Sequence, residues 1–399
     1  MFQYKNFILI ITTLPIILSS CVSANTQFNK SQKNLRLYAI KTQEYPQQPD
    51  YWYELGHAFI GVNGVFTNGI SAPEAFQKAL TLYQEQGDEV HEADAAFYLA
   101  TAYRLKNKPS EAIDFNERAI QLNLELNRPY MKYMAEIQGL ILKASFLDIK
   151  NNETNAALDD ITSQLKTFKA KIENSAIVPP KGKRAVFYEN CSWPMRKLIK
   201  RECNVFRFDL SGAYAMAMES IADQYYQRQM YKKSSALFLL AKKEFTEIEH
   251  DIGVARQNIM LSKIAQYYEG DIEKAASLLK SGIYVFSLEE YPTFIGPDNY
   301  RLGLLQMYLK KWKMATVNLS KAHPYFVMSG DKKEAEHIAN IRNFSENCYA
   351  KEVDSEISNC ETELTDENEL VISSDDFQLS IINFHGSILY KEHNTLFSW

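Results

Sequence analysis

Small and apolar residues recur along this chain with a period of about 40 positions. Ala79 lies 40 positions before Ala119, and Gly282 lies 41 positions after Ala241. Within a period, a small residue that follows an apolar one is followed by a second small residue 12 positions later. A third small residue comes 7 positions after the second. These sets are Ala100, Ala112 and Ala119; Ala222, Ser234 and Ala241; and Gly303, Ala315 and Ala322. The period predicts stacked units, each with two helices that pack closely where small residues meet.

One unit carries the clearest motif. Trp52, Leu55, Gly56 and Phe59 are followed, after a Gly- and Asn-rich stretch at 61–69, by Ala72, Phe76 and Ala79. This arrangement resembles the tetratricopeptide repeat (TPR), whose pattern is W-x₂-L-G-x₂-Y and then A-x₃-F. The resemblance implies an all-α fold, a right-handed α-solenoid of antiparallel helix pairs.

The repeat defines a domain plan for the mature chain. TPR-like repeats are predicted at 51–175 and 211–352, with units at 51–88, 89–128, 132–175, 211–248, 252–288 and 296–330 and a closing helix at 332–352. The third unit depends mainly on Ala144 and Ala156, and the fifth has Lys263 at its expected small position. Residues 353–399 are predicted to be an acidic linker and a tail whose β-prone runs, 370–373 and 377–390, form a small hairpin against the last repeat.

The N-terminus has the layout of an export signal. A 12-residue apolar run at 7–18 follows Lys5 and is too short to span a membrane. Leu18-Ser19-Ser20-Cys21 resembles the lipobox of bacterial lipoproteins, which implies cleavage of the signal peptide 1–20, lipidation of Cys21 by acyl chains such as palmitate, and a linker or helix at 21–50. In enteric bacteria the absence of Asp at this position, which Val22 occupies here, permits transfer to the outer membrane, so the expected location is the outer membrane, facing the periplasm. The alternatives are an ordinary signal peptide whose boundary happens to hold a cysteine, and cleavage after Ala24.

Residues 176–210 form an inserted excursion between repeats. Its basic residues are Lys181, Lys183, Arg184, Arg196, Lys197, Lys200 and Arg201. They are consistent with contact to an acidic partner or an anionic envelope polymer, or with an ordinary solvated loop.

The four cysteines beyond Cys21 form two local pairs. Cys191 and Cys203, and likewise Cys348 and Cys360, are separated by 12 positions. Export to an oxidising compartment favours disulfides, and closing each short loop is the simplest of three connectivities. The alternative is four reduced, buried thiols.

Composition and motifs exclude several function classes. The net charge is −5, so no overall basic field points to a nucleic acid partner. Phosphate-binding loops, nucleophile elbows and simple zinc motifs are absent from the sequence. The sequence therefore predicts a protein without cofactor or metal that is not an enzyme. A catalytic site in the excursion or the tail is the competing reading.

The first helix of each unit should face an inner groove. Counting from the small positions places these residues there: His57, Thr101, Arg104, Asp223, Tyr226, Tyr267, Tyr268, Leu304, Met307 and Tyr308. Arg104 would hold a carboxylate, and Tyr226, Tyr268 and Tyr308 would provide aromatic contacts to a peptide. Alternatively, the tyrosines pack between units. Together these features predict a membrane-anchored scaffold that binds a protein or peptide partner, or else a regulatory or accessory subunit of an envelope hydrolase or of a secretion or assembly system.

Overall fold

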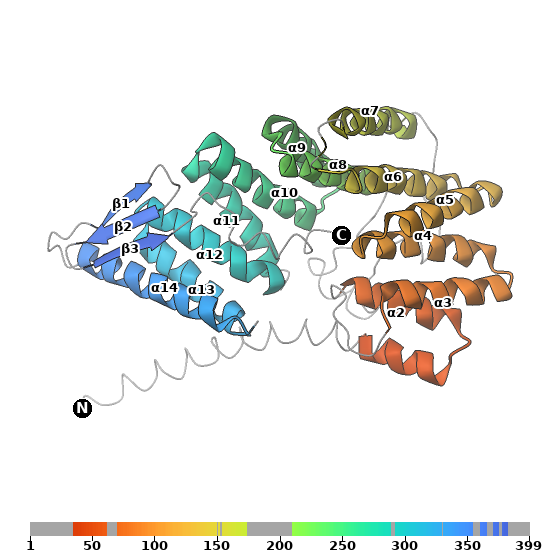
Figure 1. Cartoon of the computed structure of the whole chain (residues 1–399), viewed down its shortest axis with the longest axis horizontal. Coiled ribbons are helices and arrows are strands. Elements are labelled where there is room, and N and C mark those ends of the chain that lie inside the picture. Colours follow the sequence, from red (N-terminus) through yellow and green to blue (C-terminus); the bar gives the residue numbers. More distant parts are fainter. Residues whose placement is uncertain are drawn as a thin grey trace. The chain divides into compact units, whose positions relative to one another are not determined.

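The computed structural model describes residues 35–61, 70–149, 151, 154–173, 210–288, 292–328, 330–353, 360–364, 370–374 and 377–381 (Figure 1). After a helix over 35–44, the described helices are α2 (Pro49–Gly61), α3 (Ala72–Glu85), α4 (Glu89–Leu105), α5 (Pro109–Glu125), α6 (Pro129–Ser145), α7 (Thr154–Glu173), α8 (Leu210–Gln227), α9 (Tyr231–Glu247), α10 (Asp251–Ile264), the π-helix η2 (Ala265–Glu269), α11 (Ile272–Leu288), α12 (Pro292–Tyr308), α13 (Trp312–Met328) and α14 (Lys332–Val353). The strands are β1 (Glu361–Leu364), β2 (Leu370–Ser374) and β3 (Phe377–Ile381).

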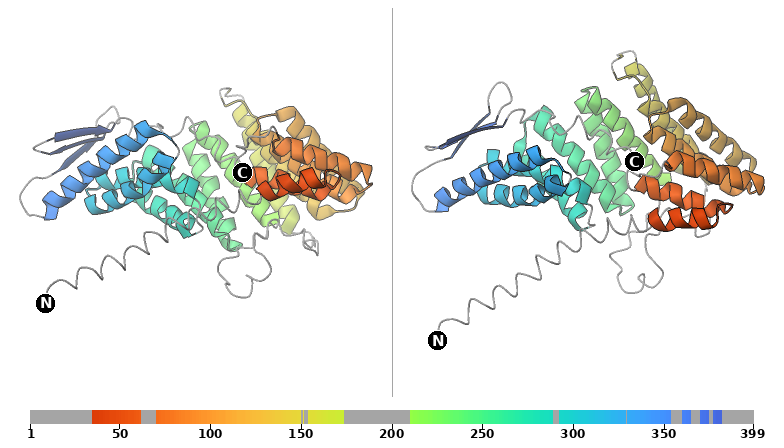
Figure 2. Two further views of the ribbon diagram at one scale, coloured as in Figure 1. Left: turned by 90° about the horizontal axis from the view of Figure 1, so that it is seen from below. Right: turned by 60° about the horizontal axis from the view of Figure 1, so that its bottom comes forward.

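Consecutive helices pack as antiparallel pairs. The pairs are α2 with α3, α4 with α5, α8 with α9, α10 with α11, and α12 with α13 (Figures 1 and 2). The second helix of a pair also contacts the first helix of the next pair, as α3 contacts α4 and α11 contacts α12. This is the packing of a TPR-like solenoid, and the predicted fold class is confirmed.

The repeated small residues lie where paired helices touch. All three of the sets found by spacing are fully buried. Two glycines of these motifs leave no room for a side chain, because a Cβ atom at Gly56 would lie 2.8 Å from the ring of Phe76, and one at Gly303 would lie 2.7 Å from Leu319 Cγ. The 12 and 7 spacing thus reflects helix pairs held at minimal separation.

Most helices are joined by the same tight turn. The residue two positions after the end of a helix has a positive φ, and the next helix begins two positions later. The non-glycine residues in this conformation are Asn107, Asn127, Gln229, Glu249 and Lys310. The turn fixes each hairpin in one geometry, because a left-handed residue ends the helix and reverses the chain.

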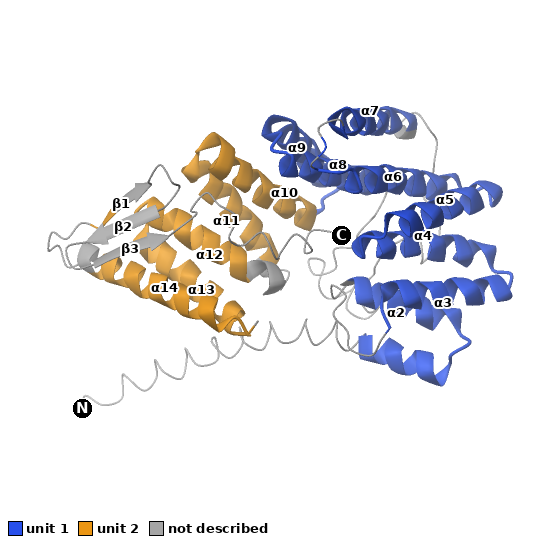
Figure 3. Ribbon diagram, viewed as in Figure 1, with its two compact units in different colours: residues 1–250, 398–399 blue, residues 251–397 orange. Residues whose placement is uncertain are grey.

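The chain divides into two compact units, coloured separately in Figure 3. Unit 1 contains the described helices up to His250, and unit 2 begins at Asp251. Each unit has its own apolar core, with Phe76, Leu99 and Phe238 fully buried in unit 1 and Leu279, Leu305 and Ile338 fully buried in unit 2.

The α7 helix departs from the repeat. It lies at the edge of unit 1 (Figures 1 and 2) and packs only lightly on α6, while α6 packs directly on α8. The reading of Ala156 as a close-packing residue was wrong, because this residue is exposed, whereas Ala144 on α6 is buried. The face of α6 around Gly139 instead borders a cleft of about 450 Å³ between α5, α6 and α7.

The C-terminal sheet is larger than the hairpin predicted. The β2 and β3 strands pair antiparallel within the expected runs, and β1 pairs with the other edge of β2 to give the order β1-β2-β3. The reading of 361–364 as linker was therefore wrong. The alternation Glu-Thr-Glu-Leu fits the two-residue period of a strand. Within unit 2, β1 contacts α12.

Some predictions fall outside the described residues. These are the signal peptide, Cys21, and the excursion up to residue 209 with Cys191 and Cys203. Among the helices that are described, none has both the length and the apolar character required to cross a bilayer.

Candidate functional site

His57 is part of the core and does not line a groove. The imidazole is 7% exposed, and its ring centroid lies 4.6 Å from that of Tyr53, 5.0 Å from Phe76 and 4.1 Å from Tyr98. Burial lowers its pKa to about 3, so the ring is neutral at physiological pH. The prediction of a groove contact at His57 was wrong, since a neutral ring fills this aromatic cluster of α2, α3 and α4.

Arg104 lies on α4 in a recessed position that still reaches solvent. Its side chain is half-buried, and burial lowers its pKa to about 10. No carboxylate of a described residue lies within ion-pair distance of it. Other arginines of unit 1 are engaged, since Arg118 pairs with Glu92, and Arg128 Nη2 lies 3.0 Å from Asp94 Oδ1. The N–H donors of Arg104 are therefore available to a carboxylate from outside the described residues.

A polar contact links the first helices of neighbouring pairs in unit 1. Gln138 on α6 donates through Nε2 to Thr101 Oγ1 at 2.6 Å and to the Phe97 carbonyl at 3.1 Å, both on α4. The Gln138 Oε1 atom is buried and has no hydrogen-bond partner. Thr101, expected to face a partner, thus helps to hold α4 against α6.

The predicted tyrosines differ in exposure. Tyr226 in unit 1 is half-buried, and its ring lies 5.5 Å from that of Tyr231. In unit 2, Tyr267 and Tyr308 are half-buried, while Tyr268 is 47% exposed. Tyr268 is therefore the most accessible of the predicted aromatic contacts.

Three further predicted residues have structural environments. Leu304 and Met307 are buried in the core of unit 2, so their prediction as groove residues was wrong. Asp223 is half-buried and accepts a hydrogen bond from Gln227 Nε2 at 2.6 Å, one turn along α8.

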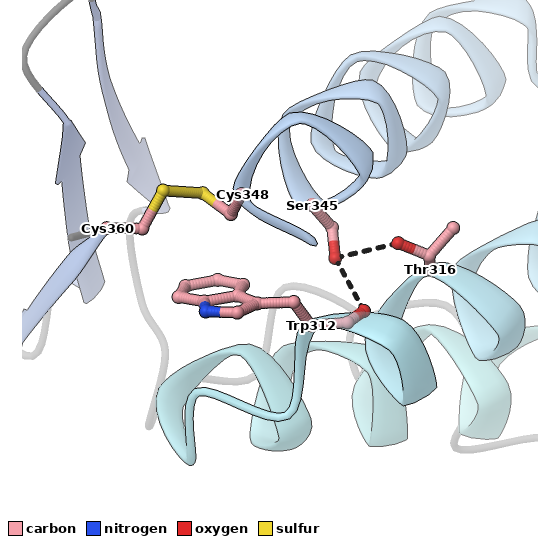
Figure 4. Close-up of a disulfide and its surroundings, with 5 residues drawn as sticks. All are labelled: Trp312, Thr316, Ser345, Cys348 and Cys360. Carbon is pink, nitrogen blue, oxygen red and sulfur yellow. Dashed lines mark hydrogen bonds between the residues drawn. A yellow bond between two sulfur atoms is a disulfide. The ribbon is translucent and has the colours of Figure 1, made fainter. Parts of the chain in front are cut away.

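A disulfide joins the closing helix to the start of the sheet. Cys348 on α14 is bonded to Cys360, which immediately precedes β1, with their Cα atoms 5.8 Å apart. Figure 4 shows the buried indole of Trp312 beside this bond. Ser345, one turn earlier on α14, accepts from Thr316 Oγ1 at 3.0 Å and donates to the Trp312 carbonyl at 3.1 Å. The disulfide thus ties the sheet to α14 beside the contacts that hold α14 to α13.

Sequence reasoning missed a second arginine with unsatisfied donors, Arg301 on α12. It is 6% exposed, and its Nη2 donates to Ser262 Oγ on α10. Its position two residues before the small residue Gly303 could have suggested an inward orientation, since the first helix of a unit faces the inner side.

The comparisons with known proteins bear on the fold alone. No protein-family model and no curated protein matches this chain. Among solved structures, it is similar to a Signal Transduction ATPase with Numerous Domains (STAND) protein with a tetratricopeptide repeat sensor, from Pyrococcus horikoshii, at 13% identity and a TM-score of 0.44, over 80% of this chain and 45% of that one. It is also similar to BtubC from P. vanneervenii, at 10% identity and a TM-score of 0.32, over 86% of this chain and 96% of that one.

The chain is a TPR-like helical repeat protein. Its own helix pairs and turns carry this assignment, because both TM-scores lie below 0.5. Such repeats present side chains from successive first helices to a partner. In the described part of the chain, no three His, Cys, Asp or Glu side chains are grouped so as to hold a metal ion.

Proposed function

We propose that this chain is a lipid-anchored scaffold of the bacterial cell envelope that binds a protein partner through unit 1, with Arg104 contacting a carboxylate of that partner. The main support for this proposal is the recessed guanidinium of Arg104, which has no carboxylate partner among the described residues. A guanidinium binds a carboxylate in a bidentate geometry and gains strength in a partly desolvated site.

The anchor is supported by the sequence around Cys21. Leu18-Ser19-Ser20-Cys21 follows an apolar run that is too short to span a bilayer. Two or three acyl chains would hold the protein at the membrane far more firmly than one. Labelling cells with a fatty-acid analogue tests this: Cys21→Ser should lose the label, and equal label in the two proteins would exclude lipidation at this residue.

Partner binding is tested by purification from solubilised envelopes. Tagged wild type should retain specific proteins that Arg104→Gln loses, while circular dichroism of the two is identical. Arg36→Gln is the matched control, because Arg36 is an exposed arginine on the helix over 35–44. Equal retention by all three proteins would exclude Arg104 from the interface. A hydrolase that co-purifies in an Arg104-dependent way would favour the accessory-subunit alternative.

A further inference from the structure

The buried charged side chains of unit 2 are all cations in the part that the structure describes. They are Arg256, Lys263 and Arg301, and no described Asp or Glu of this unit is equally buried. Unit 1 differs, because its buried carboxylates Glu92, Asp94 and Glu244 each pair with a basic side chain. Unit 2 therefore buries three cationic side chains, of which Arg301 is considered below.

Arg301 is the buried cation whose surroundings leave it least satisfied. Its guanidinium has five N–H donors, yet Nη2 donates to the Ser262 hydroxyl while Nε and Nη1 have no acceptor. No carboxylate of a described residue lies within ion-pair distance. A buried charge without a counter-ion is strongly unfavourable. Arg301 thus has the property expected of a group that awaits an anion.

The helix facing Arg301 contributes further unsatisfied polar groups. Gln257 on α10 is fully buried, and neither atom of its amide has a partner. One turn before Ser262, Asn258 has a buried Oδ1 without a partner, although its Nδ2 donates to Ser281 Oγ at 3.3 Å. The α10 helix then passes into the π-helix η2, a distortion that is frequent at functional sites.

Tyr267 of η2 lies near Arg301 and is only partly covered. Its side chain is half-buried, and burial raises its pKa, while the nearby Arg301 charge opposes that shift and Asp298 adds to it. The electrostatic effect of Arg301 on Tyr267 indicates that the two side chains are close. An anion entering beside Tyr267 would meet the guanidinium.

We propose that Arg301 and Ser262 form a binding site for a small carboxylate ligand in unit 2. A carboxylate is planar and offers two oxygens to the donors that remain on the guanidinium. The nearly closed surroundings of Arg301 favour a small acid over a polypeptide segment. This site is independent of the proposed contact at Arg104, which lies in unit 1.

Thermal unfolding of the purified full chain tests the site. Acetate and succinate should raise Tm saturably relative to chloride at equal ionic strength and pH. Arg301→Met should abolish the rise. In chloride alone, Arg301→Met should have a Tm about 2–4 °C above wild type, because an unpaired buried charge is removed. Arg301→Lys keeps the positive charge but lacks the planar guanidinium with its paired N–H donors, and it should also lose the response to carboxylates.

Arg228→Met is the matched control. Arg228 also has a partly unsatisfied guanidinium, but it donates to the carbonyls of Gln224 at 3.1 Å and Leu147 at 3.3 Å. Its loss should lower Tm and leave the carboxylate response intact. A lower Tm for Arg301→Met in chloride, or a carboxylate response that survives this change, would overturn the proposal. A larger rise with inorganic phosphate, or with a glutamate-containing peptide amide than with succinate, would overturn the assignment to a small carboxylate.

Discussion

Gly303 of α12 lies directly against Leu319 of α13, so that a Cβ atom added to Gly303 would be 2.7 Å from Leu319 Cγ and 2.9 Å from its Cδ2. The contact sits at the first small position of a repeat set. This close contact explains why the spacing of small residues predicts which helices pair. Where two helices approach this closely, one methyl group changes the separation that the whole hairpin must adopt.

Gly303→Ala should therefore destabilise the protein despite the higher helix propensity of alanine. Overpacking of this kind costs about 1–3 kcal/mol. The matched control is Gly139→Ala on α6, where the only nearby atom is the Asn116 Nδ2 at 3.1 Å, on the border of the cleft. Chemical denaturation should show a clearly smaller effect for the control. Equal effects of the two changes would mean that helix propensity, not packing, dominates.

The helices could be predicted from the sequence because small residues are required wherever the pairs meet. The connecting turns were less visible, since Gln229, Glu249 and Lys310 adopt a left-handed conformation that normally favours glycine or asparagine. At Gln229 and Lys310 this conformation is imposed by the helix pairs on either side, α8 with α9 and α12 with α13.

The candidate site was less predictable than the fold. A helical position tells which side of a helix a residue occupies, but not whether a neighbouring helix covers it. His57 was assigned to an open groove and lies in a closed aromatic cluster, while Arg104 at a comparable position remains recessed and accessible. The position of α7 at the edge of unit 1 could not be predicted either. Its buried residues Leu158, Ile161 and Leu165 form the apolar stripe that any helix packed on one side would have.

His57 should make the stability of the protein sensitive to acid. Its pKa is about 3 in the folded state, against about 6.5 when unfolded. Below pH 6.5 the unfolded chain binds a proton that the folded chain does not. The free energy of unfolding should then fall by up to about 1.4 kcal/mol per pH unit between pH 6.5 and 3. Above pH 6.5 His57 contributes no pH dependence.

Urea denaturation of wild type and His57→Phe across this range isolates the contribution. Phenylalanine keeps an aromatic ring in the cluster but cannot titrate, and the other groups titrate in both proteins. The difference between the two free energies should grow as the pH falls. Parallel curves from pH 7 to pH 4 would contradict the burial of a neutral imidazole.

Polar contacts hold α7 to the rest of unit 1. Tyr225 on α8 donates to Asp159 Oδ1 at 2.5 Å, and Lys233 Nζ lies 2.6 Å from the same atom. Tyr225→Phe should increase amide hydrogen exchange in α7 about tenfold, because a hydrogen bond to a charged acceptor is lost. Exchange in α4 and α5 should not change. Gln164→Ala, which removes only an exposed bond within α7, is the control. Unchanged exchange in α7 after Tyr225→Phe would show that its apolar stripe suffices to hold it.

The disulfide between Cys348 and Cys360 should stabilise unit 2. It closes a loop with a sequence separation of 12, for which the chain-entropy model gives about 3 kcal/mol. The double variant Cys348→Ala, Cys360→Ala should have a lower Tm, and reductant should bring wild type down to the same value. Any further effect of reductant on the double variant would report a bond between Cys191 and Cys203. Peptide mapping of the exported protein without reduction provides the direct measurement, and free thiols at Cys348 and Cys360 would contradict the prediction.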